Sequence, residues 1–227
     1  SRGLGDVYKR QLWVSLFAIL IALPFGLSVA IYMSEVANSR IRNLLKPIIE
    51  LLSGIPSVVY GFFGLIVIVP FIQKVFNLPV GESGLAGSIV LAIMALPTII
   101  TVTEDAMRNC PRAMREASLA LGASQWQTIY KVVIPYSVSG ITSGVVLGIG
   151  RAIGETMAVL MVTGNAAVIP HTILEPLRTI PATIAAELGE APAGGAHYEA
   201  LFLLGVVLFF ISLLINFTVE AVSARKR

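Results

Sequence analysis

The sequence has 227 residues, of which 56% are apolar and 13% are charged, and its formal net charge is +3. A soluble globular domain carries about 25% charged residues, so this composition excludes an ordinary soluble protein. The charged residues also leave six uncharged stretches of 19 to 24 residues. Because a helix rises about 1.5 Å per residue, about 20 apolar residues cross a hydrocarbon core about 30 Å thick. The chain is therefore predicted to be an all-α integral membrane protein.

Residues 1–11 do not fit the pattern of the rest of the chain. Lys9 and Arg10 would lie at the outer end of the first span, where cations are unusual. The segment SRGLGDVYKRQ also resembles an adapter-derived translation at the start of environmental sequence fragments. Residues 1–11 are therefore predicted to be a non-native leader, with one membrane domain over 12–227; a short native periplasmic lead is the alternative.

Five membrane spans are predicted, and the fourth absorbs an interruption by two charged residues, Arg151 and Glu155. Between the first two spans, the segment Arg40–Leu52 has apolar residues at helical spacing, which predicts an amphipathic helix at the membrane surface. The predicted spans are Leu12–Met33, Ser57–Val75, Leu85–Thr103, Val133–Val162 and Tyr198–Val222.

The lysine and arginine residues distribute unequally between the two sides that these spans define. With residues 1–11 set aside, one side holds only Lys74 and Arg178, whereas the other holds all the remaining Lys and Arg residues of the connecting loops and the C-terminal end. Because Lys and Arg accumulate in cytoplasmic loops, the richer side is predicted to be cytoplasmic, with the C-terminus inside. The loop 104–135 is then cytoplasmic and the loop 163–197 is periplasmic.

The cytoplasmic segment Glu116–Pro135 is predicted to form two short helices with a sharp turn. Gly122 supplies a left-handed stop for the first helix. Ser124 and Gln127 have the spacing of a capping box that starts the second. A helical pair of this size cannot bury its own apolar face, so it would suit docking into a groove of a soluble partner. The alternative is an ordinary loop that packs on its own bundle.

The fourth span carries the most informative charged residues. An arginine at the centre of a membrane span costs about 2.5–3.5 kcal/mol on insertion scales, so Arg151 should face a polar interior. Glu155 follows four residues later, where it would share a helix face with Arg151. A guanidinium group matches the oxygens of phosphate, and a nearby carboxylate would limit how tightly an anion is held. The alternative is a static salt bridge without substrate contact. Earlier in the same span, a stripe of small residues predicts close helix packing, formed by Gly140, Gly144 and Gly148.

Four stretches of sequence resemble known transport proteins. Glu116, Ala117, Ser118, Gly122 and Pro135 keep the spacing of the permease loop of ABC importers, in which Ser118 replaces an alanine. The segments Ser53–Leu65, Leu96–Arg108 and Arg151–Asn165 resemble phosphate-transport permeases. The last of them resembles the PstC type more closely than the PstA type.

The resemblance implies a MetI-like type I importer fold with a five-helix core, in a multi-pass protein of the cytoplasmic (inner) membrane. Family members usually have six spans, so it also implies that a first span is missing. Residues Arg151 and Glu155 match those implicated in phosphate passage, and the loop matches the coupling helix that receives force from the ATPase. The implied partners are a PstA-type permease, an ATPase dimer and a periplasmic phosphate-binding protein, with no nucleic acid.

The sequence predicts no cofactor or metal in this chain and no catalytic residues. It contains no Gly-Lys dipeptide, so it has no P-loop, and ATP and Mg²⁺ would be bound by the partner ATPase. Cys110 is the only cysteine and has no neighbouring Cys or His. Two further functions are considered: a permease for another oxyanion, such as molybdate or sulfate, and an ion-driven secondary transporter or anion channel. The internal repeat that many secondary transporters show is not evident.

Overall fold

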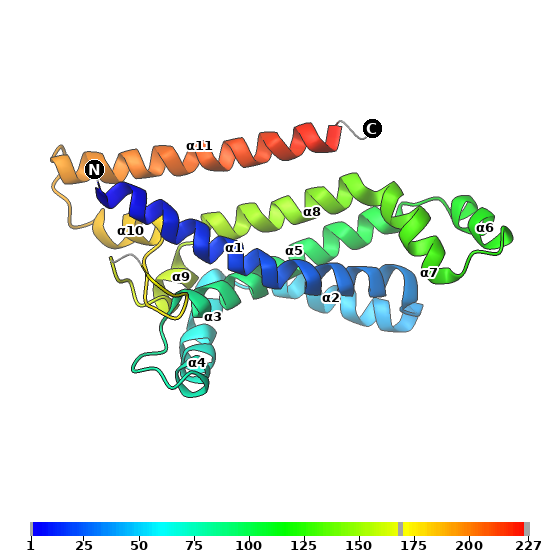
Figure 1. Ribbon diagram of the computed structural model, residues 1–227, viewed down its shortest axis with the longest axis horizontal. Coiled ribbons are helices and arrows are strands. Elements are labelled where there is room, and N and C mark those ends of the chain that lie inside the picture. The colour runs from blue at the N-terminus through cyan, green and yellow to red at the C-terminus, as the bar shows by residue number, and fades with distance from the viewer. Residues whose placement is uncertain (1, 168–169, 225–227) are drawn as a thin grey trace. The chain divides into compact units, whose positions relative to one another are not determined.

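All the named secondary-structure elements in the described part of the chain are helices (Figure 1). The computed structural model describes the backbone of residues 2–167 and 170–224, and the side chains of residues 8–167, 170–217 and 221. Within these residues there is no strand, only one isolated parallel bridge between Gly164 and Leu177. The elements in chain order are α1 Arg2–Ile31, η1 Tyr32–Val36 (a π-helical turn, as are η2 and η3), α2 Ser39–Gly54, α3 Ser57–Phe63, η2 Gly64–Ile68, α4 Val69–Val75, α5 Gly84–Arg108, α6 Arg112–Ala120, α7 Gln125–Thr128, η3 Ile129–Val133, α8 Ile134–Gly154, α9 Met157–Val162, α10 Ile180–Glu187 and α11 Ala196–Ala224.

The described part of the chain has five helical segments that are long and apolar enough to cross a membrane, which confirms the predicted number. The second span has the predicted bounds, and the other four overlap the predicted spans but differ from them in at least one bound. They are Tyr8–Val36, Ser57–Val75, Gly84–Arg108, Gln125–Gly154 and Ala196–Phe217. The predicted amphipathic helix Arg40–Leu52 is also confirmed, as α2.

The predicted start of the first span and the predicted end of the fourth span are wrong. The first span does not begin at Leu12, because α1 is already helical from Arg2. Gln11 is buried there, donates to the carbonyl of Ile153 at 3.4 Å and accepts from the backbone of Ile180 at 3.2 Å. These hydrogen bonds compensate for the loss of water around Gln11, whose burial would otherwise be unfavourable. The origin of residues 1–11 stays a prediction.

The fourth span ends at Gly154 and does not continue to Val162. Glu155 and Thr156 are not helical, and α9 begins as a separate helix at Met157. The carboxylate of Glu155 accepts a hydrogen bond from the backbone of Ala158 at 3.2 Å. This bond satisfies one of the free N–H groups at the start of α9, which stabilises a new helix start after the break.

The chain divides into two compact units, and the helices α1, α5, α8 and α11 contribute residues to both. Unit 1 comprises Ser1–Ala22, Ile55–Ala95 and Ile149–Leu214; unit 2 comprises Leu23–Gly54, Leu96–Gly148 and Ile215–Arg227. In unit 1, the short helix α9 packs against α3, η2 and the first half of α5. The core that these elements share with α4 includes Tyr60, Ile72, Val90, Ala158 and Val162.

Unit 2 is held together by close packing of α8 on α5. A Cβ atom placed on Gly140 would lie 2.3 Å from the Cβ of Ala106, and one on Gly144 would lie 3.1 Å from the hydroxyl of Thr103. Gly148 is buried. Ser137 adds a hydrogen bond to the carbonyl of Ala106 at 3.1 Å. Such contacts between helix backbones suit a membrane environment, where close packing rather than water exclusion drives association.

Candidate functional site

Arg151 lies in the last turn of α8, in unit 1, with a half-buried side chain. A cation at this position interacts favourably with the free carbonyl groups at the helix C-terminus. Glu155 is also half-buried but lies in the break after the helix. The prediction that the two residues share one helix face is therefore wrong, because α8 ends at Gly154 before the next turn is complete.

Tyr60 adds a hydroxyl group to the surroundings of Arg151. It lies on α3 in the core of unit 1, is 7% exposed, and interacts electrostatically with Arg151. Tyr60 was not predicted from the sequence as a site residue. The only available signal was a phenol inside an otherwise apolar span, which is a weak indication, since tyrosine also packs well in helix cores. A guanidinium and a phenol together offer several hydrogen-bond donors to an anion.

The loop between α5 and α8 exposes apolar side chains. No residue of α6 is buried. The exposed fractions are 50% for Leu119, 90% for Leu121 and 65% for Trp126. Glu116 and Ala117 are exposed on the same helix, and Pro135 is exposed at the start of α8. The loop therefore presents three large apolar side chains that the rest of the described chain does not cover.

The turn between α6 and α7 has the predicted local structure. Gly122 adopts φ +83°, in the left-handed region that ends a helix. The capping box is confirmed: Ser124 accepts from the backbone of Gln127 at 3.2 Å, and Gln127 accepts from that of Ser124 at 2.8 Å. The hydroxyls of Ser118 and Thr128, 2.9 Å apart, join the two helices. The loop is therefore an ordered helical pair with an exposed apolar surface.

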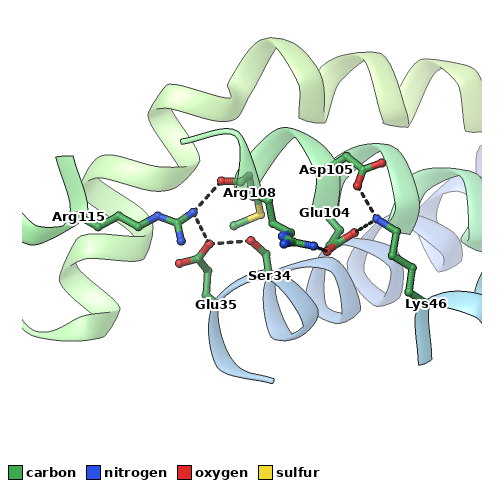
Figure 2. A network of polar contacts seen from close by, with 8 residues as sticks. Ser34, Glu35, Lys46, Glu104, Asp105, Arg108 and Arg115 are labelled. Atoms are coloured by element: carbon green, nitrogen blue, oxygen red, sulfur yellow. Dashed lines mark hydrogen bonds and ion pairs between the residues drawn. The ribbon is translucent and has the colours of Figure 1, made fainter. Parts of the chain in front are cut away.

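Two clusters of charged residues connect this loop and α2 to the rest of unit 2 (Figure 2). In the first, Arg115 of α6 forms an ion pair with Glu35 at 2.9 Å. In the second, Glu104 of α5 is 1% exposed and pairs with Lys46 of α2 at 2.8 Å and with Arg108 at 3.4 Å. Neither cluster was predicted from the sequence. The position of Glu104 at the end of an apolar stretch was the only sequence signal for a buried charge. Its partner Lys46 could not be identified, because it lies 58 residues away in the sequence.

Lys46 also binds Asp105 at 2.6 Å. Burial lowers the pKa of Lys46, but the hydrogen bonds and charges of Asp105 and Glu104 outweigh that effect, so its pKa is raised above the ordinary 10.5. The lysine is therefore fully charged at neutral pH and stabilises the buried carboxylate of Glu104. These contacts join α2 to α5.

The loop 163–197 contains its own polar cluster in unit 1. Arg178 forms an ion pair with Glu187 and donates to the carbonyl of Asn165 at 3.0 Å. His197 lies 3.2 Å from the other oxygen of Glu187. Among the residues that the structure describes, no group of three or more His, Cys, Asp or Glu side chains is arranged to hold a metal ion.

Five apolar spans, a helix break beside a half-buried arginine and an exposed helical loop define a polytopic membrane subunit of the permease class. The chain belongs to the family described as binding-protein-dependent transport system inner membrane component, whose model matches residues 15–227.

Similar curated proteins carry transport names. A Bacillus subtilis (strain 168) protein named "Probable ABC transporter permease protein YqgH" is 43% identical over 94% of this chain and 69% of its own length. The "Phosphate transport system permease protein PstC" of Mesorhizobium japonicum is 39% identical over 94% of this chain and 70% of its own length.

Solved structures of this fold include a chain of the MetNI methionine ABC transporter, with a TM-score of 0.70 and 20% identity over 100% of this chain and 95% of that one. A chain of a bacterial ABC transporter that imports alginate has a TM-score of 0.71 and 18% identity, over 99% of this chain and 80% of that one. These likenesses confirm the predicted MetI-like fold.

Proposed function

We propose that this chain is the permease subunit of an ATP-driven importer that carries inorganic phosphate across the cytoplasmic membrane. The similarity to phosphate transport system permeases carries the proposal: the PstC proteins of Mesorhizobium japonicum and Pasteurella multocida are 39% and 36% identical over 94% and 87% of this chain. The C-terminus and the loop 104–135 lie in the cytoplasm, as the distribution of Lys and Arg indicates.

Arg151 lowers the barrier for the anion within the membrane. A phosphate ion that enters the bilayer loses part of its hydration, and a guanidinium replaces water with charge-assisted hydrogen bonds. Tyr60 adds a neutral donor nearby. Glu155, whose carboxylate repels the anion, prevents binding so tight that release would fail. The break after Gly154 supports this role, because non-helical backbone inside a membrane protein is tolerated where it is buried or lines an aqueous path.

The exposed loop receives the force that drives transport. Its surface of Leu119, Leu121 and Trp126 suits a groove of a separate ATPase dimer, which binds ATP and Mg²⁺. A second permease of the PstA type completes the pathway, and a periplasmic phosphate-binding protein delivers phosphate to the loop 163–197. This chain itself performs no chemistry.

The test is uptake of radiolabelled phosphate into proteoliposomes that contain the chain with its PstA-type partner, the ATPase and the binding protein. Arg151→Gln should lower uptake about 10- to 100-fold, because a hydrogen bond to a charged group contributes about 1.5–3 kcal/mol. The matched control is Arg40→Gln, which removes an exposed cation on α2. Uptake that persists without ATP, or that sulfate or molybdate blocks more strongly than unlabelled phosphate, would contradict the proposal.

A further inference from the structure

Glu35 lies in the π-helical turn η1, where α1 ends. Its side chain is 8% exposed, so its charge is largely withdrawn from water. A buried carboxylate is costly unless hydrogen-bonded groups compensate it. Two donors do so here: Arg115 at 2.9 Å and the hydroxyl of Ser34 at 2.7 Å.

Glu35 contacts both helices of the exposed loop. Its carboxylate binds Arg115 of α6, and its backbone carbonyl accepts a hydrogen bond from the side chain of Gln125, at the start of α7, at 3.0 Å. The same nitrogen of Arg115, Nη2, also donates to the carbonyl of Met107 near the end of α5, at 2.8 Å. In Figure 2, two dashed lines start from the guanidinium of Arg115, and one of them ends at Glu35. One ion pair thus joins the ends of α1 and α5 to α6.

These polar contacts matter because apolar packing holds α6 weakly. No residue of α6 is buried. An apolar contact lets helices slide past each other, whereas charge-assisted hydrogen bonds are directional and fix a geometry. Low exposure also strengthens them, since water does not screen the charges. A displacement of α6 should therefore pull the ends of α1 and α5 with it.

We infer that Glu35 and Arg115 are positioning residues that form the mechanical joint between the ATPase-coupling helix and the membrane helices α1 and α5. The inference rests on the proposed function, because an ATPase must act on α6. Without the joint, ATP hydrolysis would still move α6, but the membrane helices would not follow, and phosphate would not be carried.

The first experiment measures phosphate uptake and ATP hydrolysis together in proteoliposomes of the complete importer. Glu35→Gln and Arg115→Gln should each lower the phosphate carried per ATP at least five-fold, while hydrolysis stays within two-fold of wild type. The charge swap Glu35→Arg with Arg115→Glu should recover part of that ratio. Glu50→Gln is the matched control, an exposed carboxylate on α2. A merely structural role would lower uptake and hydrolysis in proportion, and that result would overturn the inference.

A second measurement tests whether α6 is coupled to the end of α1, and its result does not depend on which solute is carried. Amide hydrogen exchange of residues 32–36 is compared in the assembled complex with and without ATP and vanadate. The exchange should respond to nucleotide in wild type and not in Glu35→Gln. An equal response in both overturns the joint. A wild-type complex that hydrolyses ATP but carries no phosphate contradicts the proposed function, and the joint is then judged on hydrogen exchange alone.

Discussion

The close approach of α8 to α5 provides a prediction of stability that needs no partner protein. Gly140→Ala adds a single methyl group, which would lie 2.3 Å from the Cβ of Ala106, whereas ordinary van der Waals contact begins at 3.4 Å. Because the Cβ of Ala106 is bound directly to its backbone, no side-chain rotation relieves the clash. The two helices must separate by about 1 Å, and the bond from Ser137 to the carbonyl of Ala106 lengthens with them.

Overpacking of this kind costs about 1–3 kcal/mol. We expect Gly140→Ala to lower the free energy of unfolding by that amount, measured by SDS titration in mixed micelles with tryptophan fluorescence. The control on the same helix is Gly150→Ala, whose added Cβ meets nothing within 4 Å. It should change stability by less than about 1 kcal/mol, the usual difference between Gly and Ala in a helix.

The double variant Gly140→Ala with Ala106→Gly identifies the cause. Removing the methyl group of Ala106 leaves the new Cβ 3.5 Å from the Ala106 Cα, an ordinary contact. The double variant should therefore be no less stable than Ala106→Gly alone, which gives a coupling energy of about 1–3 kcal/mol. If Gly140→Ala is as stable as Gly150→Ala, or if the coupling energy is below about 0.5 kcal/mol, the packing argument is refuted.

Three further predictions concern unit 2. Glu104→Gln should lower the free energy of unfolding by about 1.5–3 kcal/mol in the same titration, because it removes charged hydrogen bonds from a buried site. Asp105→Asn, at a carboxylate that is 53% exposed, should lower it by less than about 1 kcal/mol. Equal losses for the two variants would contradict the role of burial. The pKa of Lys46 is higher in the folded state than in the unfolded state, so its contribution is complete below the ordinary pKa of 10.5 and is lost as pH rises through the folded pKa. The stability difference between wild type and Lys46→Met should accordingly be constant from pH 7 to 9 and shrink above about 10.5, and a difference that grows there would refute the assignment. Ser124→Ala should lower the stability of α7 by about 1 kcal/mol, because the capping box is lost. Amide hydrogen exchange in residues 125–128 should then be faster than in wild type. Unchanged exchange would show that the cap does not stabilise α7.

The Lys46–Glu104 and Glu35–Arg115 clusters show why part of the site could not be predicted. Lys46 and Glu104 are 58 residues apart in the sequence, and Gln125 is 90 residues from Glu35. A hydrophobic pattern places each residue on a helix but does not say which helix ends meet. Glu155 illustrates a local failure: the spacing of four residues predicts a shared face with Arg151 only if the helix continues, and the carboxylate instead caps α9.

The sequence by itself determined the number of spans, the amphipathic helix α2, the left-handed turn at Gly122 and the capping box at Ser124. These features depend on segment length, hydrophobic period and backbone preferences, which residues close together in the sequence determine. Only the tertiary structure decided the partners of Glu35, Lys46 and Glu104, the proximity of Tyr60 to Arg151 and the end of α8 at Gly154. The reason is that a buried charge or a helix break is stabilised by the groups that surround it in space, and chain folding alone brings those groups together.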